Sequence, residues 1–321
     1  MDIPAEDLQL LTLPALIAAS ISIPRLSPRT FSLITLTLIF PLSFAILAHS
    51  LFTHPILSRL QQQNDQNTLD SGHEWALLFS IQFLYLLFLF SFSLLSTAAV
   101  VFTVASIYSS KPVSFSNTIS AIPSVFRRLF VTFLWVSLLM FAYNVVFLVI
   151  LVLIIVAVDT DSPLLLMVSM VLAFGLFIFV HVYITALWHL ASVVSVLENV
   201  YGLAAMRKSY ELLKGKVYMA GVFVFGYLVV CGVINGVFGA VVVHGDGDYS
   251  VFMRVVVGGL LVAVLVIVNL VGLLVQSVFY YVCKSFHHQE IDKSALHDHL
   301  GGYLGEYVPL KSSIQMENLD I

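Results

Sequence analysis

The sequence predicts an all-α, polytopic membrane protein built around a bundle of six transmembrane helices. Composition gives the first two indications: 60% of the 321 residues are hydrophobic and only 10% are charged, whereas an ordinary soluble domain has about 25% charged residues. The third indication is that the apolar residues form six long, continuous runs. A water-soluble fold of this length could not bury so much apolar surface, so lipid must solvate much of it.

Each apolar run is long enough to cross a bilayer as a helix, since about 20 apolar residues span the hydrocarbon core. The runs are continuous and do not alternate in polarity, which favours helices over a membrane β-barrel. Polar segments separate them, and two of these, 159–163 and 244–250, are short enough to be tight turns. The expected spans are 31–51, 76–107, 129–158, 164–197, 217–243 and 251–283.

Three regions follow from this division. Residues 1–30 are expected to form a partly amphipathic N-terminal arm, 31–285 the transmembrane domain, and 286–321 a polar tail. The first residues include Asp2, Glu6 and Asp7, and are therefore acidic where a cleaved signal peptide would be basic. The first apolar run is thus expected to act as a retained signal anchor.

The basic residues predict the orientation of the spans. Of the 14 Lys and Arg residues, only Arg59 and Arg254 fall on one predicted side, which leaves 12 on the other. Cytosolic connections retain Lys and Arg. Both termini are therefore expected to face the cytosol, in a membrane of the endomembrane system or in the plasma membrane.

Two basic connections have an amphipathic pattern. In 114–130 and in 202–213, apolar side chains recur at helical spacing beside the cations. Such segments are typical of short helices at the membrane interface, where cations meet anionic headgroups; the alternative is an ordinary cytosolic loop. The candidate headgroup contacts are Arg127, Arg128, Arg207, Lys208, Lys214 and Lys216.

The order of the elements also suggests a parallel internal repeat. The spans 76–107 and 164–197 are each followed by a basic segment and then by another span. The third span has Asn-Val-Val-Phe from Asn144, and the fifth has Asn-Gly-Val-Phe from Asn235. Units of the same orientation would be related by an axis along the membrane normal.

One helical face of the fourth span is polar. His181, Thr185, His189 and Ser192 follow one another at spacings of four, four and three residues. Asn269 and Gln276, two turns apart, share a face of the sixth span. Polar groups inside a membrane usually face the bundle interior or a wet cavity, so these six residues could line a binding or permeation site. The alternative is that neighbouring helices satisfy them in a packed core, as structural contacts.

Two short patterns near the termini are similar to sorting signals. Glu6, Leu10 and Leu11 fit an acidic dileucine form, and Tyr307 with Leu310 fits a tyrosine-x-x-hydrophobic form. Both would lie on the predicted cytosolic side, where protein partners could bind them. The leucines could equally open an amphipathic N-terminal helix.

The sequence contains no pattern that predicts catalysis or a bound cofactor. It has no glycine-rich phosphate loop, nucleophile elbow or zinc-protease motif. Cys231 and Cys283 lie in apolar runs and are expected to be small buried hydrophobes. A net charge of −4 argues against nucleic acid as a partner. Membrane lipids are the expected partners, and the oligomeric state is left open.

Several stretches of the chain look familiar, and they are 31–36, 41–44, 47–49, 202–209, 212–216 and 306–311. Together they resemble a plant family of uncharacterised six-span membrane proteins. More distantly, 202–215 is similar to the membrane domain of some bacterial glycerophosphodiester phosphodiesterases. The resemblance implies a membrane fold and no activity, since phosphodiester cleavage in those enzymes belongs to a separate soluble barrel.

Taken together, the sequence favours a non-enzymatic membrane protein, a scaffold or accessory factor in membrane organisation or trafficking. The alternative is a carrier or channel for a lipid or small solute. The two differ in whether the polar faces of the fourth and sixth spans line one open cavity.

Overall fold

The computed structural model describes residues 11–65, 72–109, 114–157, 163–245, 247 and 249–289. Every regular element in these ranges is a helix, which confirms the predicted all-α class. The elements are α2 (Leu13–Ser22), the 3-10 turn η1 (Ile23–Leu26), α3 (Pro28–Ile34), the π turn η2 (Thr35–Ile39), α4 (Phe40–Asp65), α5 (Gly72–Tyr108), α6 (Phe115–Ala157), α7 (Pro163–Leu197), α8 (Leu203–Leu213), α9 (Val217–Phe238), the π turn η3 (Gly239–Val243) and α10 (Val251–Phe286).

Six helical stretches are long and apolar enough to cross a membrane, which confirms a multi-pass membrane protein. The first is longer than expected: α3, η2 and α4 continue one another, and the stretch runs over Pro28–Leu60. Its polar end stays helical because α4 packs against α5, where His49 Nε2 and Gln82 Oε1 are 2.9 Å apart. The other five are His73–Tyr108, Val125–Ala157, Leu164–Leu197, Val217–Val243 and Val251–Phe286.

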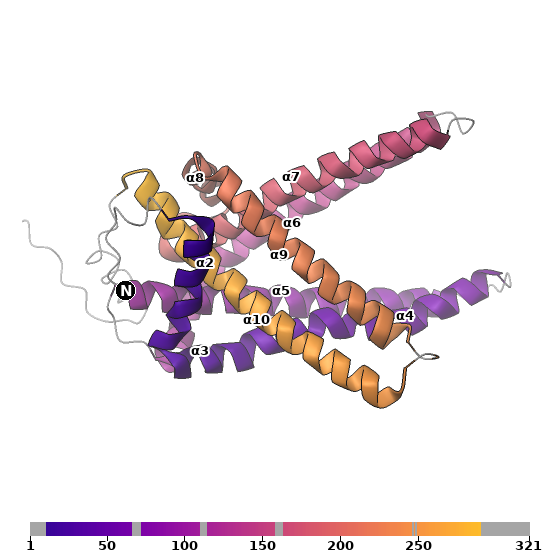
Figure 1. Ribbon diagram of the computed structural model, residues 1–321, viewed down its shortest axis with the longest axis horizontal. Coiled ribbons are helices and arrows are strands. Elements are labelled where there is room, and N and C mark those ends of the chain that lie inside the picture. The colour runs from indigo at the N-terminus through magenta and orange to yellow at the C-terminus, as the bar shows by residue number, and fades with distance from the viewer. Residues whose placement is uncertain are drawn as a thin grey trace, which may run out of the picture.

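The spans form three hairpins that meet at one end of the molecule and diverge at the other (Figure 1). The hairpins are α4 with α5, α6 with α7, and α9 with α10, and the partners in each hairpin are in contact. α2, α3 and α8 lie at the end where the hairpins meet, which we call the convergent end. We call the opposite ends of the hairpins the splayed arms. There the α6–α7 hairpin lies apart from the other two hairpins.

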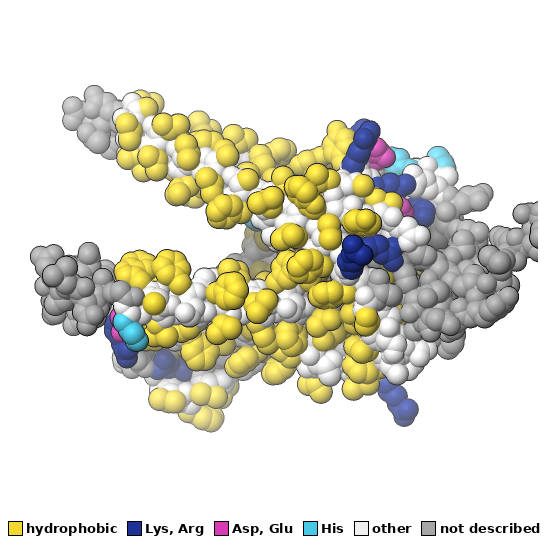
Figure 2. Space-filling model, turned by 180° about the vertical axis from the view of Figure 1, so that it is seen from behind, with side chains coloured by type: hydrophobic (Ala, Val, Ile, Leu, Met, Phe, Trp, Pro, Cys, Tyr) yellow, Lys and Arg dark blue, Asp and Glu magenta, His cyan; other side chains and the backbone are white. Residues whose placement is uncertain are grey.

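The surface follows the same division (Figure 2). The splayed arms are covered with apolar side chains, and an open cleft separates two of them. Most Lys and Arg side chains gather at the convergent end. Exposed apolar side chains on arms of this length fit contact with lipid hydrocarbon.

The buried core lies where the hairpins meet. Large side chains that are almost fully buried come from several elements there, among them Phe31, Leu94, Leu129, Leu190 and Leu213. The N-terminal arm contributes too: α2 packs against α10, and Leu16, Ser20 and Ile23 are buried. The described part of the arm is thus joined to the bundle, with no boundary visible at residue 30.

The two basic connections differ from the expected pair of interfacial helices. Residues 115–128 do not form a helix of their own, because they are the first turns of the 43-residue α6. α8 is a separate short helix, but its buried side chains include Ala205, Ser209 and Leu212, and it packs against α7. Its buried face therefore rests on protein, and its cations remain on the outer side.

The two asparagines of the predicted repeat make the same kind of local contact. Asn144 Nδ2 donates to the Met140 carbonyl at 2.7 Å, and Asn235 Nδ2 donates to the Cys231 carbonyl at 2.8 Å. Both amides thus satisfy a carbonyl of their own helix. The connecting segments differ, since one continues into α6 and the other forms α8. The repeat stays a prediction.

Candidate functional site

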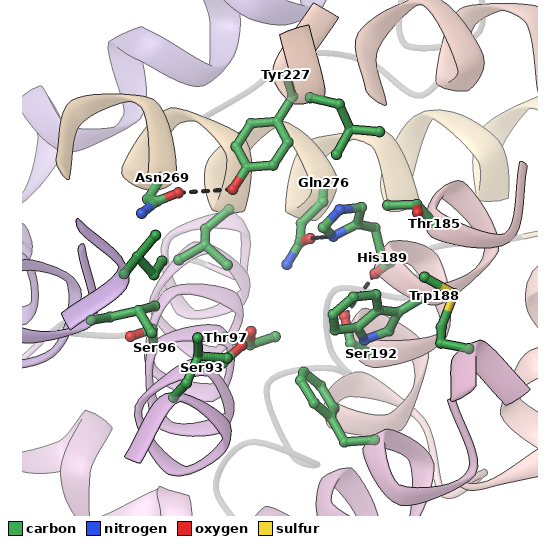
Figure 3. A pocket seen from close by; sticks show the side chains of 18 of the residues that line it. Ser93, Ser96, Thr97, Thr185, Trp188, His189, Ser192, Tyr227, Asn269 and Gln276 are labelled. Atoms are coloured by element: carbon green, nitrogen blue, oxygen red, sulfur yellow. Dashed lines mark hydrogen bonds between the residues drawn. The ribbon is translucent and has the colours of Figure 1, made fainter. Parts of the chain in front are cut away.

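A cavity of about 220 Å³ lies where the three hairpins meet, and all six spans line it. The polar faces predicted on the fourth and sixth spans both open into this space (Figure 3). The structure therefore brings together the six candidate residues of the sequence. They are His181, Thr185, His189, Ser192, Asn269 and Gln276.

On one side of the cavity, lining residues of α7 and α10 are joined by a hydrogen bond. His189 Nδ1 donates to Gln276 Oε1 at 2.6 Å, since an amide oxygen can only accept. This arrangement places the proton of a neutral imidazole on Nδ1 and leaves Nε2 as an acceptor. The Ser192 hydroxyl donates to the His189 carbonyl at 2.8 Å.

A second chain of hydrogen bonds joins α4, α9 and α10. The Tyr227 hydroxyl donates to Asn269 Oδ1 at 2.8 Å, and Asn269 Nδ2 donates to Ser43 Oγ at 2.8 Å. Gly272 allows this approach, because a Cβ at this position would lie 3.2 Å from the Tyr227 ring. The amide of Asn269 is therefore held in a fixed orientation beside the cavity.

Three polar atoms of the cavity have no hydrogen-bond partner among the described residues. They are Ser96 Oγ, Thr185 Oγ1 and His181 Nδ1, and each is shielded from solvent. Ser96 is 0% exposed and Thr185 4%, while the His181 ring stacks on Phe177 at 5.7 Å. A buried polar group without a partner costs about 1–3 kcal/mol, so a side-chain rotation that turned one of these atoms into the cavity, toward a polar ligand group, would be favourable.

The chain belongs to the family described as Domain of unknown function (DUF8558), which matches residues 1–319. No curated protein and no solved structure matches it. Membership of this family brings no activity with it, so the functional argument rests on the site. The similarity to a plant family and to a phosphodiesterase membrane domain stays a prediction.

Sequence reasoning missed four polar residues of the lining. They are Ser93, Ser96 and Thr97 of α5 and Tyr227 of α9. The hydroxyls of α5 follow at spacings of three and one, and this helical pattern in an apolar run could have revealed them. Tyr227 carries no periodic signal, because only the packing of α9 on α10 brings it to Asn269.

A second polar cluster lies at the convergent end, and we call it the clamp: Arg128, Glu198, Tyr280 and Lys284. Tyr280 donates to Glu198 Oε1 at 2.6 Å, and Lys284 Nζ lies 3.7 Å from the same oxygen. Arg128 donates to the Glu198 carbonyl at 3.1 Å and to Asn199 Oδ1 at 2.6 Å. The clamp thus ties α6, α7 and α10 together.

The six candidate headgroup contacts have unlike roles. Arg128 is used inside the protein, by the clamp. Arg207 lies 3.7 Å from Glu211 in an exposed pair, and the ammonium groups of Lys214 and Lys216 lie over the rings of Tyr210 and Phe286. Arg127 and Lys214 are exposed and Lys208 is half-buried, so the positions of these side chains allow headgroup contact.

The candidate sorting motifs fall almost wholly outside the described residues. Glu6, Leu10, Tyr307 and Leu310 all lie there. Leu11 is described, and its half-buried side chain packs against the core.

Proposed function

We propose that this protein binds an uncharged amphipathic lipid inside the bilayer. The polar headgroup would occupy the central cavity, and the hydrocarbon part would extend between the splayed arms. The observation that carries the proposal is that three residues of a cavity lined by all six spans have a buried polar atom without a partner: Ser96 Oγ, Thr185 Oγ1 and His181 Nδ1. The proposal develops the alternative given in the sequence analysis, a carrier or channel for a lipid or small solute.

The volume of the cavity supports a headgroup rather than a whole lipid. About 220 Å³ corresponds to roughly seven water molecules at about 30 Å³ each. A glycerol or comparable polar group fits such a space, whereas a lipid chain does not. The hydrocarbon chains of the lipid would lie in the cleft between the splayed arms (Figure 2). The apolar side chains on both sides of this cleft match lipid hydrocarbon.

The chemistry of the lining supports an uncharged headgroup. Hydroxyl, imidazole and amide groups line the cavity, and no Asp, Glu, Lys or Arg is among its lining residues. A phosphate or ammonium placed there would lose its hydration without gaining a counter-charge, which is costly. Hydroxyl and carbonyl groups need only the neutral donors and acceptors that these residues offer.

The proposed activity is binding or transfer without covalent chemistry. A nucleophilic serine needs a base within hydrogen-bond reach, and Ser192 instead donates to a backbone carbonyl. The scaffold or accessory function that the sequence favours remains a second proposal. It does not use the cavity, so variants of the cavity distinguish the two.

The test removes the unpartnered hydroxyls while keeping the shape of the cavity. The double variant Ser96→Ala with Thr185→Val should weaken photo-crosslinking to a diacylglycerol probe about tenfold or more, because each lost hydrogen bond contributes about 1 kcal/mol. The thermal stability of the unliganded protein should not fall, since neither hydroxyl bonds to the fold.

A matched control is Ser80→Ala on the exposed side of α5, whose hydroxyl donates only to the Ala76 carbonyl. This variant should bind the probe like the parent. Unchanged crosslinking in the double variant would refute the lipid proposal and favour the accessory role.

We also infer that the convergent end faces the cytosol, with both termini on that side. The clustering of Lys and Arg at this end (Figure 2) supports the inference. Terminal tags should therefore be digested by protease in cells whose plasma membrane is permeabilised and whose organelles are intact. Protection of either tag would contradict the assignment.

A further inference from the structure

A second hollow runs along the outside of the bundle, between α10 and the first span. Two cavities, of about 760 and 530 Å³, meet there, since Phe40 and Gly259 line both. We call this hollow the outer groove. Its lining on α10 includes three small residues, Gly258, Gly259 and Ala263, among larger apolar ones. A Cβ at Gly259 would meet nothing within 4 Å, so the groove is open at this point.

The lining of the outer groove becomes less polar with distance from the convergent end. Arg25 lines the end nearest η1, the hydroxyl residues Ser32 and Thr35 follow, and Leu36 and Phe40 come next. Beyond Phe40 the lining is apolar as far as Arg254, whose guanidinium donates to the Val242 carbonyl. A charged, then hydroxyl, then apolar order matches the order of groups in a phospholipid.

The dimensions also match one leaflet. From Pro28 to Phe40 the chain is a continuous helix, so these twelve steps rise about 18 Å at about 1.5 Å each. Half of a hydrocarbon core of about 30 Å is about 15 Å. A lipid whose headgroup lies at the level of Arg25 would therefore place its acyl chain along Leu36, Phe40 and Gly259.

The charge of the groove selects the class of lipid. No Asp or Glu lines either cavity, while Arg25 lines one and Arg29 is exposed in the first turn of α3. Guanidinium groups bind phosphate through paired hydrogen bonds. We propose that the outer groove binds one acidic phospholipid, with its phosphate at Arg25 and Arg29. This site is separate from the central cavity and does not depend on it.

The test uses a tryptophan reporter in the groove. Leu36 is 65% exposed, so Leu36→Trp places an indole in the groove without disturbing the core. The full chain would be placed in phosphatidylcholine nanodiscs and titrated with dibrominated phosphatidic acid or dibrominated phosphatidylcholine, with the parent protein as the blank. We expect phosphatidic acid to quench the reporter at a mole fraction at least fivefold lower than phosphatidylcholine does, because the two arginines attract an anionic headgroup.

Two variants and one control decide the outcome. Arg25→Gln with Arg29→Gln should abolish the preference, and Gly259→Leu should reduce quenching by both lipids because its side chain fills the groove. Phe179→Trp, at a position 74% exposed on α7, should show no preference. An equal preference at positions 36 and 179, or a preference that survives the arginine substitutions, would overturn the proposal. Quenching unchanged by Gly259→Leu would also overturn it.

Discussion

The large apolar residues in the two halves of α7 have different surroundings. Toward the convergent end, Leu190 and Val193 are 1% and 0% exposed. Toward the splayed arm, Leu164 and Leu172 are 70% and 69% exposed, although they are as apolar as Leu190 and Val193. Lipid tails are as apolar as leucine. Apolar composition therefore shows that a residue is inside the membrane, and only packing shows whether its neighbours are protein or lipid.

The largest expected contrast between the halves comes from one substitution made twice on α7. Leu190→Ala should reduce the free energy of unfolding by about 2–4 kcal/mol, because it leaves a cavity in packed protein. Leu172→Ala should change it by less than about 0.5 kcal/mol, since lipid can fill the space. Unfolding by SDS titration in mixed micelles measures both. Equal losses would mean that the arm is covered by protein, such as another copy of the chain.

A smaller contrast concerns two glutamates of the convergent end. Glu198→Ala should cost about 2 kcal/mol, since it removes the acceptor of Tyr280 and leaves the partly buried Lys284 without its counter-ion. Glu211→Ala removes an exposed pair with Arg207 and should cost less than about 0.5 kcal/mol. The same titration applies, with Glu198→Gln as a variant that keeps the shape. If both alanine variants were equally mild, the clamp would not hold the hairpins together.

The number and position of the spans could be predicted because hydropathy depends on the chain alone. Residues 164–197 and 217–243 were expected and are observed as spans. The end of the first span was placed too early, at residue 51, because His49 and the residues after it look polar. The packing of α4 on α5 and the contact of His49 with Gln82 keep this part helical, and neither is visible in local sequence.

The candidate site could be predicted in part, for the same reason. His181, Thr185 and His189 share a face by helical spacing alone, and they line one cavity. That this face meets Asn269, Gln276 and the α5 hydroxyls is a matter of how separate helices pack, which spacing within one helix does not determine. The role of Arg128 was missed for a similar reason, since its partner Glu198 lies 70 residues away.

The π turns η2 and η3 have a consequence for changes in the length of the chain. Across η2, the buried residues Ile34 and Ile39 are five apart, and Ser43 and Leu47 then follow at intervals of four. Phe238 and Val243 make the same five-residue step across η3. Each π turn thus contains one residue more than an α-helical turn. Deleting one residue from a π turn should restore a regular α-helix in which the buried residues on either side keep facing the core. A deletion elsewhere in a span would rotate all helical residues beyond it by about 100° about the helix axis.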